Sequence, residues 1–451
     1  MDRTRTGSEI RLNRGVFYYT GNPLLILNLN GKRECKLLLA DRDDIELLSL
    51  IREKGIVNDD PALGKQRAGK VRRWVEEGIL IEEDPRRAEK PRANNLIFPL
   101  FREYAAGQVT GERHSLVEYH REKITDPREQ FEDEEITLAH MYRFPHPALR
   151  GVSYGARFAQ MCLHRGLVKA GAKILEVGGG TGYFGNAFLT HLREEVPDLY
   201  RTIHYTFFEL SPVLLVSQRE KNSSHKNVTS FIEGNIEDHD FGEAEFSLVI
   251  SNEMIADLGV AKLKKAYFLL NEMPPESLRE IVAFCKKCGL TFDDAFEEFL
   301  VNIGAFRFLS TLGKMLAPDG AAVIVEYGDM HLYPSASVLG NHTEYSIHFG
   351  HLVEVAKRLG FAVEYSDMPD FFGFKTDERV LDYLSFTALK EHILPFFGRT
   401  ISHVAYTEER LGEALGAECL PHLHGLRFSP VSEARGRVNP QDFKALVLTR
   451  T

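Results

Sequence analysis

The sequence predicts an α/β protein in which a doubly wound, mostly parallel sheet follows a small N-terminal α+β module. From residue 171 onward, short apolar runs alternate with amphipathic stretches long enough for crossover helices. One apolar run, residues 173–177, leads directly into a glycine-rich turn at residues 178–182. Residues 1–90 differ, because closely spaced strand and turn signals precede two helical patterns there.

Composition indicates a globular chain of more than one domain. The 451 residues are 43% hydrophobic and 27% charged. The net charge of −10 argues against broad nucleic-acid binding, and no apolar run is long enough to predict a transmembrane helix. The N-terminus lacks the apolar core of a secretory signal, and the five cysteines make no disulfide framework. We therefore expect a cytoplasmic protein with no membrane partner.

The N-terminal module is expected to span residues 1–90. Three strand candidates come first, at 16–19, 24–29 and 35–39, and Asn30-Gly31 is a hairpin signal between the last two. Two helical patterns follow at 41–54 and 65–77, and a closing strand is expected at 78–81. This order resembles a winged-helix domain and the PqqD-like peptide-recognition domains that precede some modifying enzymes. The second helix is basic, as a DNA-reading helix would be, but acidic residues follow it directly. A peptide or protein partner, packing, or dimerisation are the alternatives.

The polar stretch at 84–92, which contains two prolines, predicts a linker, and residues 91–150 are expected to be a linker and helical lead-in to the next domain. Residues 151–451 carry the α/β domain, with strand candidates at 173–177, 203–209, 228–232, 246–251, 321–327, 361–365 and 443–449. Residues 257–318 are too long for one crossover, which predicts a helical insertion beside the carboxyl ends of the strands, where ligands bind. We expect a second insertion at 376–438.

The glycine turn predicts a site for a nucleotide-like ligand. It contains Gly178, Gly179, Gly180 and Gly182. Their spacing differs from the Gly-x-Gly-x-x-Gly fingerprint of dinucleotide sites, although Gly180, Gly182 and Gly185 match that fingerprint in a second frame. A loop that binds a nucleotide triphosphate is excluded, because no Gly-Lys-Ser/Thr follows. Glu176 stands two residues before Gly178, and an acid there suits a ligand with a cationic amine better than a pyrophosphate.

Polar residues also end the next two strands. Glu209, followed by Leu210, can accept hydrogen bonds from both hydroxyls of a ribose. Asn235, or the backbone of Ile236, is placed to bind an adenine amino group, with Ile236 packing on the ring. The ends of these two strands lie at the same edge of the sheet as the glycine turn. The residues at this edge together predict that the ligand is an adenosyl-sulfonium compound.

The fourth strand ends at Asn252 and Glu253, where the reactive methyl group of such a ligand is expected. Glu253 is the candidate to bind a substrate cation or to act as a base, with structural support as the alternative. Methyl transfer from a sulfonium needs alignment and proton removal rather than a covalent intermediate. Cys285 and Cys288 have no partner pair, so we predict no metal site.

Five segments carry a family resemblance: "ILEVGGGTGYFG" (174–185), "YTFFELSPVLLVSQRE" (205–220), "SNEMIADLGV" (251–260), "VIVEYGD" (323–329) and "DFKALVL" (442–448). They resemble the class I S-adenosylmethionine-dependent methyltransferases, and more closely the MidA-like family, which includes the mitochondrial complex I assembly arginine methyltransferase. The resemblance covers roughly residues 150–451. It implies a Rossmann-like, seven-stranded methyltransferase fold and S-adenosyl-L-methionine as cofactor. The run from Met254 to Gly259 departs from that family's Phe-Asp-Ala-Leu-Pro-like pattern and leaves the acceptor open.

The leading hypothesis is thus a methyltransferase acting on a peptide, a protein or a natural-product acceptor. One alternative is a cofactor-binding scaffold or chaperone that transfers no methyl group, which the altered run after Glu253 motivates. A second alternative is a winged-helix regulator whose sheet domain senses a metabolite.

Overall fold

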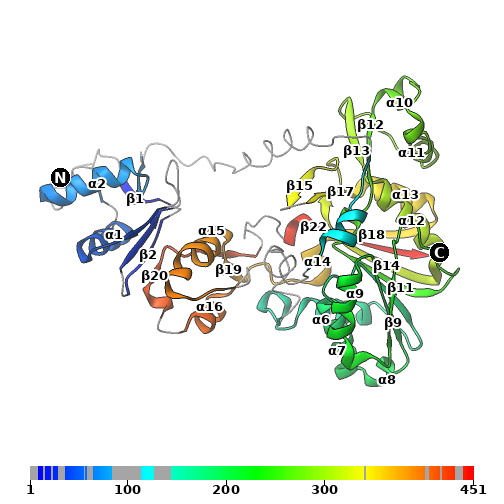
Figure 1. Ribbon diagram of the computed structural model, residues 1–451, viewed down its shortest axis with the longest axis horizontal. Helices are drawn as coiled ribbons and strands as arrows, with labels where there is room; N and C mark the ends of the chain where they lie inside the picture. The colour runs from blue at the N-terminus through cyan, green and yellow to red at the C-terminus, as the bar shows by residue number, and fades with distance from the viewer. Residues whose placement is uncertain are drawn as a thin grey trace, which may run out of the picture. The chain divides into compact units, whose positions relative to one another are not determined.

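The computed structural model describes residues 9–13, 16–21, 24–28, 36–54, 56–57, 64–83, 113–125, 144–339, 342–401, 406–416, 419–431 and 440–450. Contacts divide the chain into two units (Figure 1): Met1–Asn95 with Glu378–Gly436, and Leu96–Asp377 with Arg437–Thr451. The predicted Asn30-Gly31 hairpin turn and the linker at 84–92 lie outside the described residues. No helix in the described ranges has the length and apolar character needed to cross a membrane.

An eight-stranded sheet forms the centre of the larger unit. Its main path runs β10 (Thr229–Glu233), β9 (His204–Glu209), β8 (Lys173–Val177), β11 (Phe246–Asn252), β14 (Leu316–Asp329), β22 (Phe443–Arg450) and β18 (Phe361–Asp367), and β17 (Ile347–His348) pairs with β14. The first five are parallel, whereas β22 is antiparallel to both its neighbours. The predicted Rossmann-like fold is therefore confirmed, and each strand candidate corresponds to one strand of the main path.

Helices that bury apolar faces accompany this sheet: α6 (Tyr154–His164), α7 (Tyr183–Glu195), α9 (Pro212–Lys221), α12 (Ile303–Met315) and α13 (Phe349–Arg358), with the short α8 (Pro197–Tyr200) and α14 (Met368–Phe372). α9 begins cleanly because Ser211 caps it and Pro212 takes its first position. Leu175, Val249 and Ile324 on the strands share one buried cluster with Phe306 and Leu309 on α12. This core fixes the strand ends that carry the candidate site.

The segment predicted as a helical insertion, residues 257–318, is mixed rather than wholly helical. It contains β12 (Val260–Lys264), α10 (Ala266–Leu269), α11 (Glu276–Lys287) and β13 (Glu298–Val301) before α12. β12 pairs antiparallel with β13 on one side and with β7 (Arg113–His114) on the other (Figure 1). Strands this short are set by their pairing partners, and these partners lie far apart in the sequence.

The described residues of the smaller unit contain three sheets, one of them two-stranded, and the predicted pair of helices. The strands β5 (Ile56–Val57), β1 (Glu9–Leu12) and β6 (Leu80–Glu83) form one antiparallel sheet, and β20 (Leu423–His424), β2 (Val16–Tyr19), β3 (Leu25–Asn28) and β4 (Lys36–Leu39) form another. The helices α1 (Arg42–Lys54) and α2 (Gly64–Glu76) pack with them through a cluster that includes Ile26, Leu48 and Trp74.

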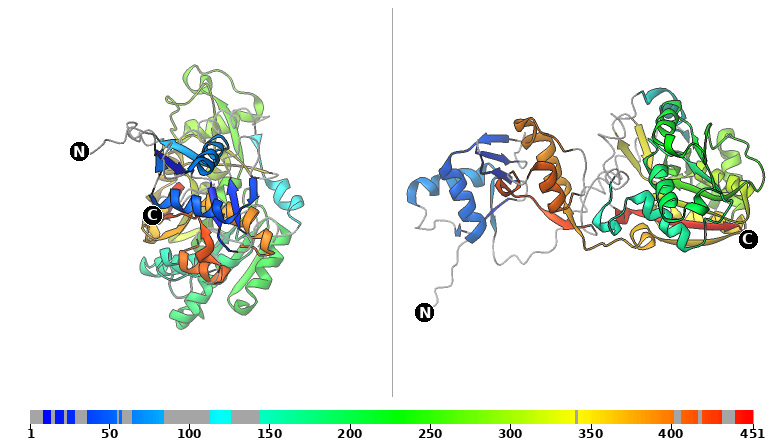
Figure 2. Two further views of the ribbon diagram at one scale, coloured as in Figure 1. Left: turned by 90° about the vertical axis from the view of Figure 1, so that its left-hand side faces the viewer. Right: turned by 90° about the horizontal axis from the view of Figure 1, so that it is seen from below.

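Residues 376–438, counted with the α/β domain in the sequence analysis, pack largely with the N-terminal residues instead. In Figures 1 and 2 the orange and red elements of this segment accompany the blue strands. They include β19 (Arg379–Leu381), α15 (Tyr383–Thr387), α16 (Glu408–Leu415), β20 and β21 (Phe428–Pro430). β20 pairs with β2, and Phe17 and Leu27 share a buried cluster with Leu389 and Leu411. No local sequence pattern reports such a distant pairing.

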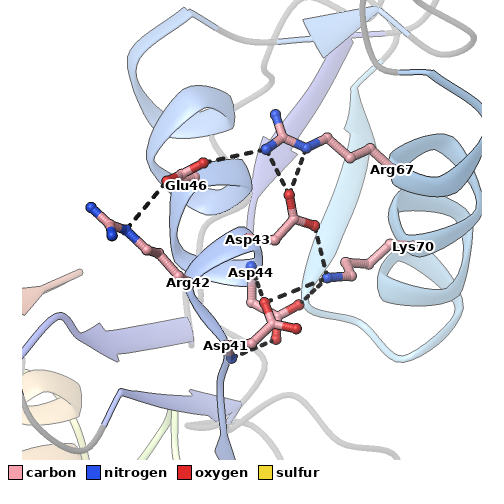
Figure 3. A network of polar contacts seen from close by, with 7 residues as sticks. All are labelled: Asp41, Arg42, Asp43, Asp44, Glu46, Arg67 and Lys70. Carbon is pink, nitrogen blue, oxygen red and sulfur yellow. Dashed lines mark hydrogen bonds and ion pairs between the residues drawn. The ribbon is translucent and has the colours of Figure 1, made fainter.

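A polar network joins α1 to α2 (Figure 3). Arg67 donates to Asp43 Oδ1 through Nε at 2.8 Å and Nη2 at 2.6 Å, and Lys70 Nζ lies 2.6 Å from Asp44 Oδ1. Hydrogen bonds from Arg67 and Lys70 lower the pKa of Asp43. These cations of the basic helix are therefore engaged by acids of the neighbouring helix, which weakens the DNA-binding alternative.

Candidate functional site

The glycine turn between β8 and α7 requires glycine at particular positions. Gly178, Gly180 and Gly182 have φ angles of +70°, +52° and +85°, in the left-handed region that side chains disfavour. A Cβ on Gly178 would lie 2.5 Å from Met254 Cγ, and one on Gly182 would lie 2.9 Å from the backbone Cα of Gln218. A Cβ on Gly180 meets nothing within 4 Å, so this glycine faces open space.

Glu176 lies behind this turn with its carboxyl group against it. The residue is 3% exposed, and the Tyr205 hydroxyl donates a 2.8 Å hydrogen bond to Glu176 Oε2. A Cβ on Gly179 would lie 3.2 Å from Oε1. Burial raises the pKa of Glu176 to about 8, although the Tyr205 hydrogen bond opposes this rise. A ligand cation at the turn would favour the ionised form, so the site suits the amine expected from the sequence.

Glu209 ends β9 and is also buried. Its Oε1 accepts from the backbone nitrogens of Leu210 at 2.9 Å and Ser211 at 3.0 Å, and its Oε2 accepts from Gln218 Nε2 at 2.9 Å. Burial raises its pKa despite these bonds. A carboxylate has about four acceptor sites. A bidentate contact to a ribose would therefore require one of these bonds to be exchanged.

The residues after β10 make contacts within the protein. Asn235 caps its own turn, because its Nδ2 donates to Asp238 Oδ2 at 2.7 Å and its Oδ1 accepts from the Glu237 nitrogen at 3.1 Å. Ile236 is 5% exposed and belongs to the central core cluster. The turn preference of asparagine explains the first observation. The Asn235 amide is thus engaged locally.

Asn252 and Glu253 lie at the end of β11, as predicted. The Tyr154 hydroxyl donates a 2.9 Å hydrogen bond to Asn252 Oδ1. Glu253 has a φ angle of +49°, which is strained for a residue with a side chain, and its backbone nitrogen donates to Val325 O at 2.9 Å. Burial raises the pKa values of Tyr154 and Glu326, and the charge of Glu253 adds to this rise. These groups form one polar cluster at the strand ends.

Sequence reasoning missed several residues of this edge. Gln218 on α9 donates both to Glu209 and to Gly180 O, each at 2.9 Å. His120 Nε2 lies 3.1 Å from Asp257 Oδ2 on the short helix Ile255–Asp257 that follows β11. Asp257 stands inside a quoted motif, but His120 lies 137 residues before it, and no local signal marked it.

Metal binding has no support within the described residues. No group of three or more His, Cys, Asp or Glu side chains there could hold an ion. Cys285 and Cys288 are buried free thiols at the end of α11. Burial raises the pKa of the Cys285 thiol to about 12, which disfavours the thiolate that a metal would need.

The fold and the site together define a class of protein. A glycine turn after the central strand β8, a buried acid before it and an acid at the end of the adjacent strand β9 lie at one edge of the sheet, which is the arrangement expected of a methyltransferase that uses S-adenosyl-L-methionine. S-adenosyl-L-methionine fits the described residues, because Glu176 offers a carboxyl group to its amine and Gly180 leaves the turn open.

Comparison with known proteins agrees with this assignment. Residues 155–348 match a family model described as "Putative S-adenosyl-L-methionine-dependent methyltransferase". The chain is a methyltransferase of the S-adenosyl-L-methionine-dependent kind, and S-adenosyl-L-methionine is its cofactor. No curated protein matches the chain.

Solved structures include similar folds at low sequence identity. An uncharacterized protein from Burkholderia thailandensis is 17% identical, with 80% of this chain and 94% of that chain covered and a TM-score of 0.44. A structure of a COG1565 superfamily member and likely methyl transferase from the same organism, bound to S-adenosyl-homocysteine, is 16% identical over 80% and 95% of the two chains, with a TM-score of 0.43. The 1,6-didemethyltoxoflavin-N1-methyltransferase of the same organism is 16% identical over 47% and 70%, with a TM-score of 0.29.

Proposed function

We propose that this methyltransferase acts on a peptide, a protein or a natural product that the strand-end cluster recognises. The observation that carries the proposal is the joining of two features at one sheet edge. Glu176 lies against the open glycine turn, and Asn252 and Glu253 end the adjacent strand β11. A methyl donor held at the turn would thus face an acceptor lying beside carboxyl groups.

We assign the following roles in this proposal. The turn glycines and Glu176 hold the methionine part of the cofactor, Glu209 and Leu210 hold its ribose, and the backbone at Asn235 and Ile236 contacts its adenine. Glu253 binds a cationic part of the acceptor or takes its proton, and Asn252 positions the reacting groups. The hydrogen bond from Tyr154 to Asn252 supports the last role, because it fixes the orientation of the amide.

The smaller unit is proposed to recognise a peptide or protein partner, or a second copy of the chain. Its order of strands and helices resembles winged-helix and PqqD-like domains, although the described β20 adds a strand from a distant part of the chain. The engagement of Arg67 and Lys70 by α1 favours these partners over DNA. We further propose a MidA-like relationship and a cytoplasmic location, on the motifs and composition given above.

Calorimetry with S-adenosylhomocysteine tests the cofactor roles. We expect binding by the full chain, and a loss of at least about tenfold in affinity for Glu209→Ala, because a charged hydrogen-bond partner is worth about 1.5–3 kcal/mol. Glu233→Ala, at the exposed end of β10, is the matched control and should bind like the wild type. A folded wild-type sample that fails to bind would refute the proposal.

A second assay separates the enzyme from an inert scaffold. Transfer of tritium from labelled S-adenosyl-L-methionine is followed in cell extract, before and after protease treatment. Label in a protease-sensitive fraction indicates a peptide or protein acceptor, and label in a resistant small fraction indicates a natural product. Tight cofactor binding without any transfer supports the scaffold alternative, which the run from Met254 to Gly259 motivates.

A further inference from the structure

A segment from before the α/β domain reaches the candidate site. β7 pairs antiparallel with β12, and the π-helix Tyr119–Lys123 follows (Figure 1, cyan). Leu116 and Ile124, on either side of that helix, are 5% and 2% exposed. The ring of Tyr119 stacks on His342 with centroids 4.2 Å apart. These contacts hold the segment in place and fix the side chain that it carries between them, His120.

His120 and Asp257 form a pair with a defined proton position. Nε2 of His120 lies 3.1 Å from Asp257 Oδ2, and the two side chains are 15% and 21% exposed. Because a carboxylate only accepts hydrogen bonds, Nε2 must carry the proton. Nδ1 of the neutral ring is then an acceptor with a free lone pair, and within the described part of the chain it makes no hydrogen bond.

Three acidic residues act on the His120 imidazole. Asp257 faces it from the turn after β11, Glu209 from the end of β9, and Glu344 from β16 (His342–Tyr345). Burial disfavours the imidazolium, but the Asp257 hydrogen bond and these three charges outweigh burial and raise the pKa. Among the described residues, the Tyr119 ring also lies against His120, and His342, which stacks on Tyr119, has its Nε2 3.0 Å from Glu344 Oε1. Because Asp257 lies on the short helix that directly follows β11, its hydrogen bond to His120 places the imidazole at the edge of the sheet where the strands end.

We propose that His120, positioned by Asp257, is the general base of the methyl transfer, an inference that rests on the proposed function. The acceptor is then one whose reacting atom bears a proton, such as an amine. Its lone pair forms the bond to the methyl carbon while the carbon–sulfur bond breaks onto sulfur, and its proton passes to His120 Nδ1. The imidazolium is stabilised by Asp257 and later releases the proton to water. Glu253 is left to bind the acceptor.

The test begins with the acid–base state of His120 in the full-length protein. Histidine labelled with nitrogen-15 is followed by NMR during a pH titration, and His120→Asn identifies the signal. We expect Nε2 to hold the proton of the neutral ring, a pKa above the ordinary value, and a lower pKa in Asp257→Asn. Addition of S-adenosylhomocysteine should shift the His120 signal but not that of the exposed His164. A signal that responds to neither Asp257→Asn nor S-adenosylhomocysteine would overturn the proposal.

Binding and transfer measurements then separate this proposal from the cofactor assignment. His120→Asn should bind S-adenosylhomocysteine within about threefold of the wild type, yet transfer methyl groups to the labelled fraction at least about 100-fold more slowly. Its rate should also lose the rise with pH that the wild type shows through the His120 pKa, an effect that a structural role would not produce. The role of His120 as the base is refuted if His120→Asn transfers methyl groups at the wild-type rate. It is also refuted if a loss of cofactor binding is the only defect of this variant. Failure of the wild type to bind refutes the proposed function instead.

Discussion

Gln218 Nε2 donates a 2.9 Å hydrogen bond to Glu209 Oε2 and a second of the same length to Gly180 O. One side-chain amide on α9 therefore connects the acid at the end of β9 to the glycine turn after β8. Gln218 is completely buried, so water cannot replace these bonds. The two parts of the proposed cofactor site are held together by Gln218, which lies in the same quoted segment as Glu209 but nine residues after it.

Gln218→Met should therefore weaken cofactor binding while keeping the volume of the side chain. We expect a loss of about ten- to hundredfold in affinity for S-adenosylhomocysteine, because Glu209 and Gly180 each lose a donor. Calorimetry measures this change, and Gln160→Met on α6 is the control. Equal affinities of the two variants would contradict the bridging role.

The two glycines of the turn should respond differently to alanine. Gly182→Ala combines a φ of +85° with a Cβ at 2.9 Å from the Gln218 backbone, so we expect a loss of stability of at least about 2 kcal/mol. Gly180→Ala has a φ of +52° but open space, and about 1 kcal/mol is expected. Urea unfolding followed by circular dichroism compares them. Similar losses in both variants would show that the close approach to Gln218 is not limiting.

Glu176 should make stability depend on pH in a defined direction. Its pKa is raised from 4.5 to about 8 by burial, so the folded chain keeps a proton that the unfolded chain releases between these values. Its contribution to stability is complete below pH 4.5 and is lost as the pH rises toward 8. Glu176→Gln removes this loss, so the difference between its unfolding midpoint and that of the wild type should increase in favour of the variant from pH 4.5 to about pH 8, the range that the shift spans. Thermal unfolding measures the gain, and the exposed Glu194→Gln should show none.

Lys70 should stabilise the smaller unit through the acids of α1. Its Nζ lies 2.6 Å from Asp44 Oδ1 and 3.1 Å from Asp43 Oδ2, and Lys70→Met leaves both carboxylates without this cation. We expect a lower unfolding midpoint, with a smaller loss at high salt because ions screen the charges. Trp74 is the single tryptophan of the chain and lies buried in this unit, so its fluorescence reports the unit alone. Lys65→Met, exposed on the same helix, should leave the midpoint unchanged.

The main sheet and its functional edge could be predicted because they are written in local patterns. A buried parallel strand requires a continuous apolar run, and the glycine turn after β8 requires glycine where φ is positive. The parallel strands β8, β9, β11 and β14 were found for this reason. The roles of Asn235 and Glu209 were harder to predict, because a strand-end polar group can bond either to a ligand or to its own turn.

By itself, the sequence determined the α/β class, the order of the strands along the chain and the acids and glycines at one edge of the sheet. The tertiary structure decided which distant segments complete them. It placed β20 beside β2, His120 against Asp257, and Gln218 between Glu209 and Gly180. Local propensity cannot specify such pairs, because their free energy comes from burial and hydrogen bonds that exist only after the chain has folded. The glycine turn therefore identifies the methyl donor, whereas the residues proposed to act on the acceptor are brought together only by the fold.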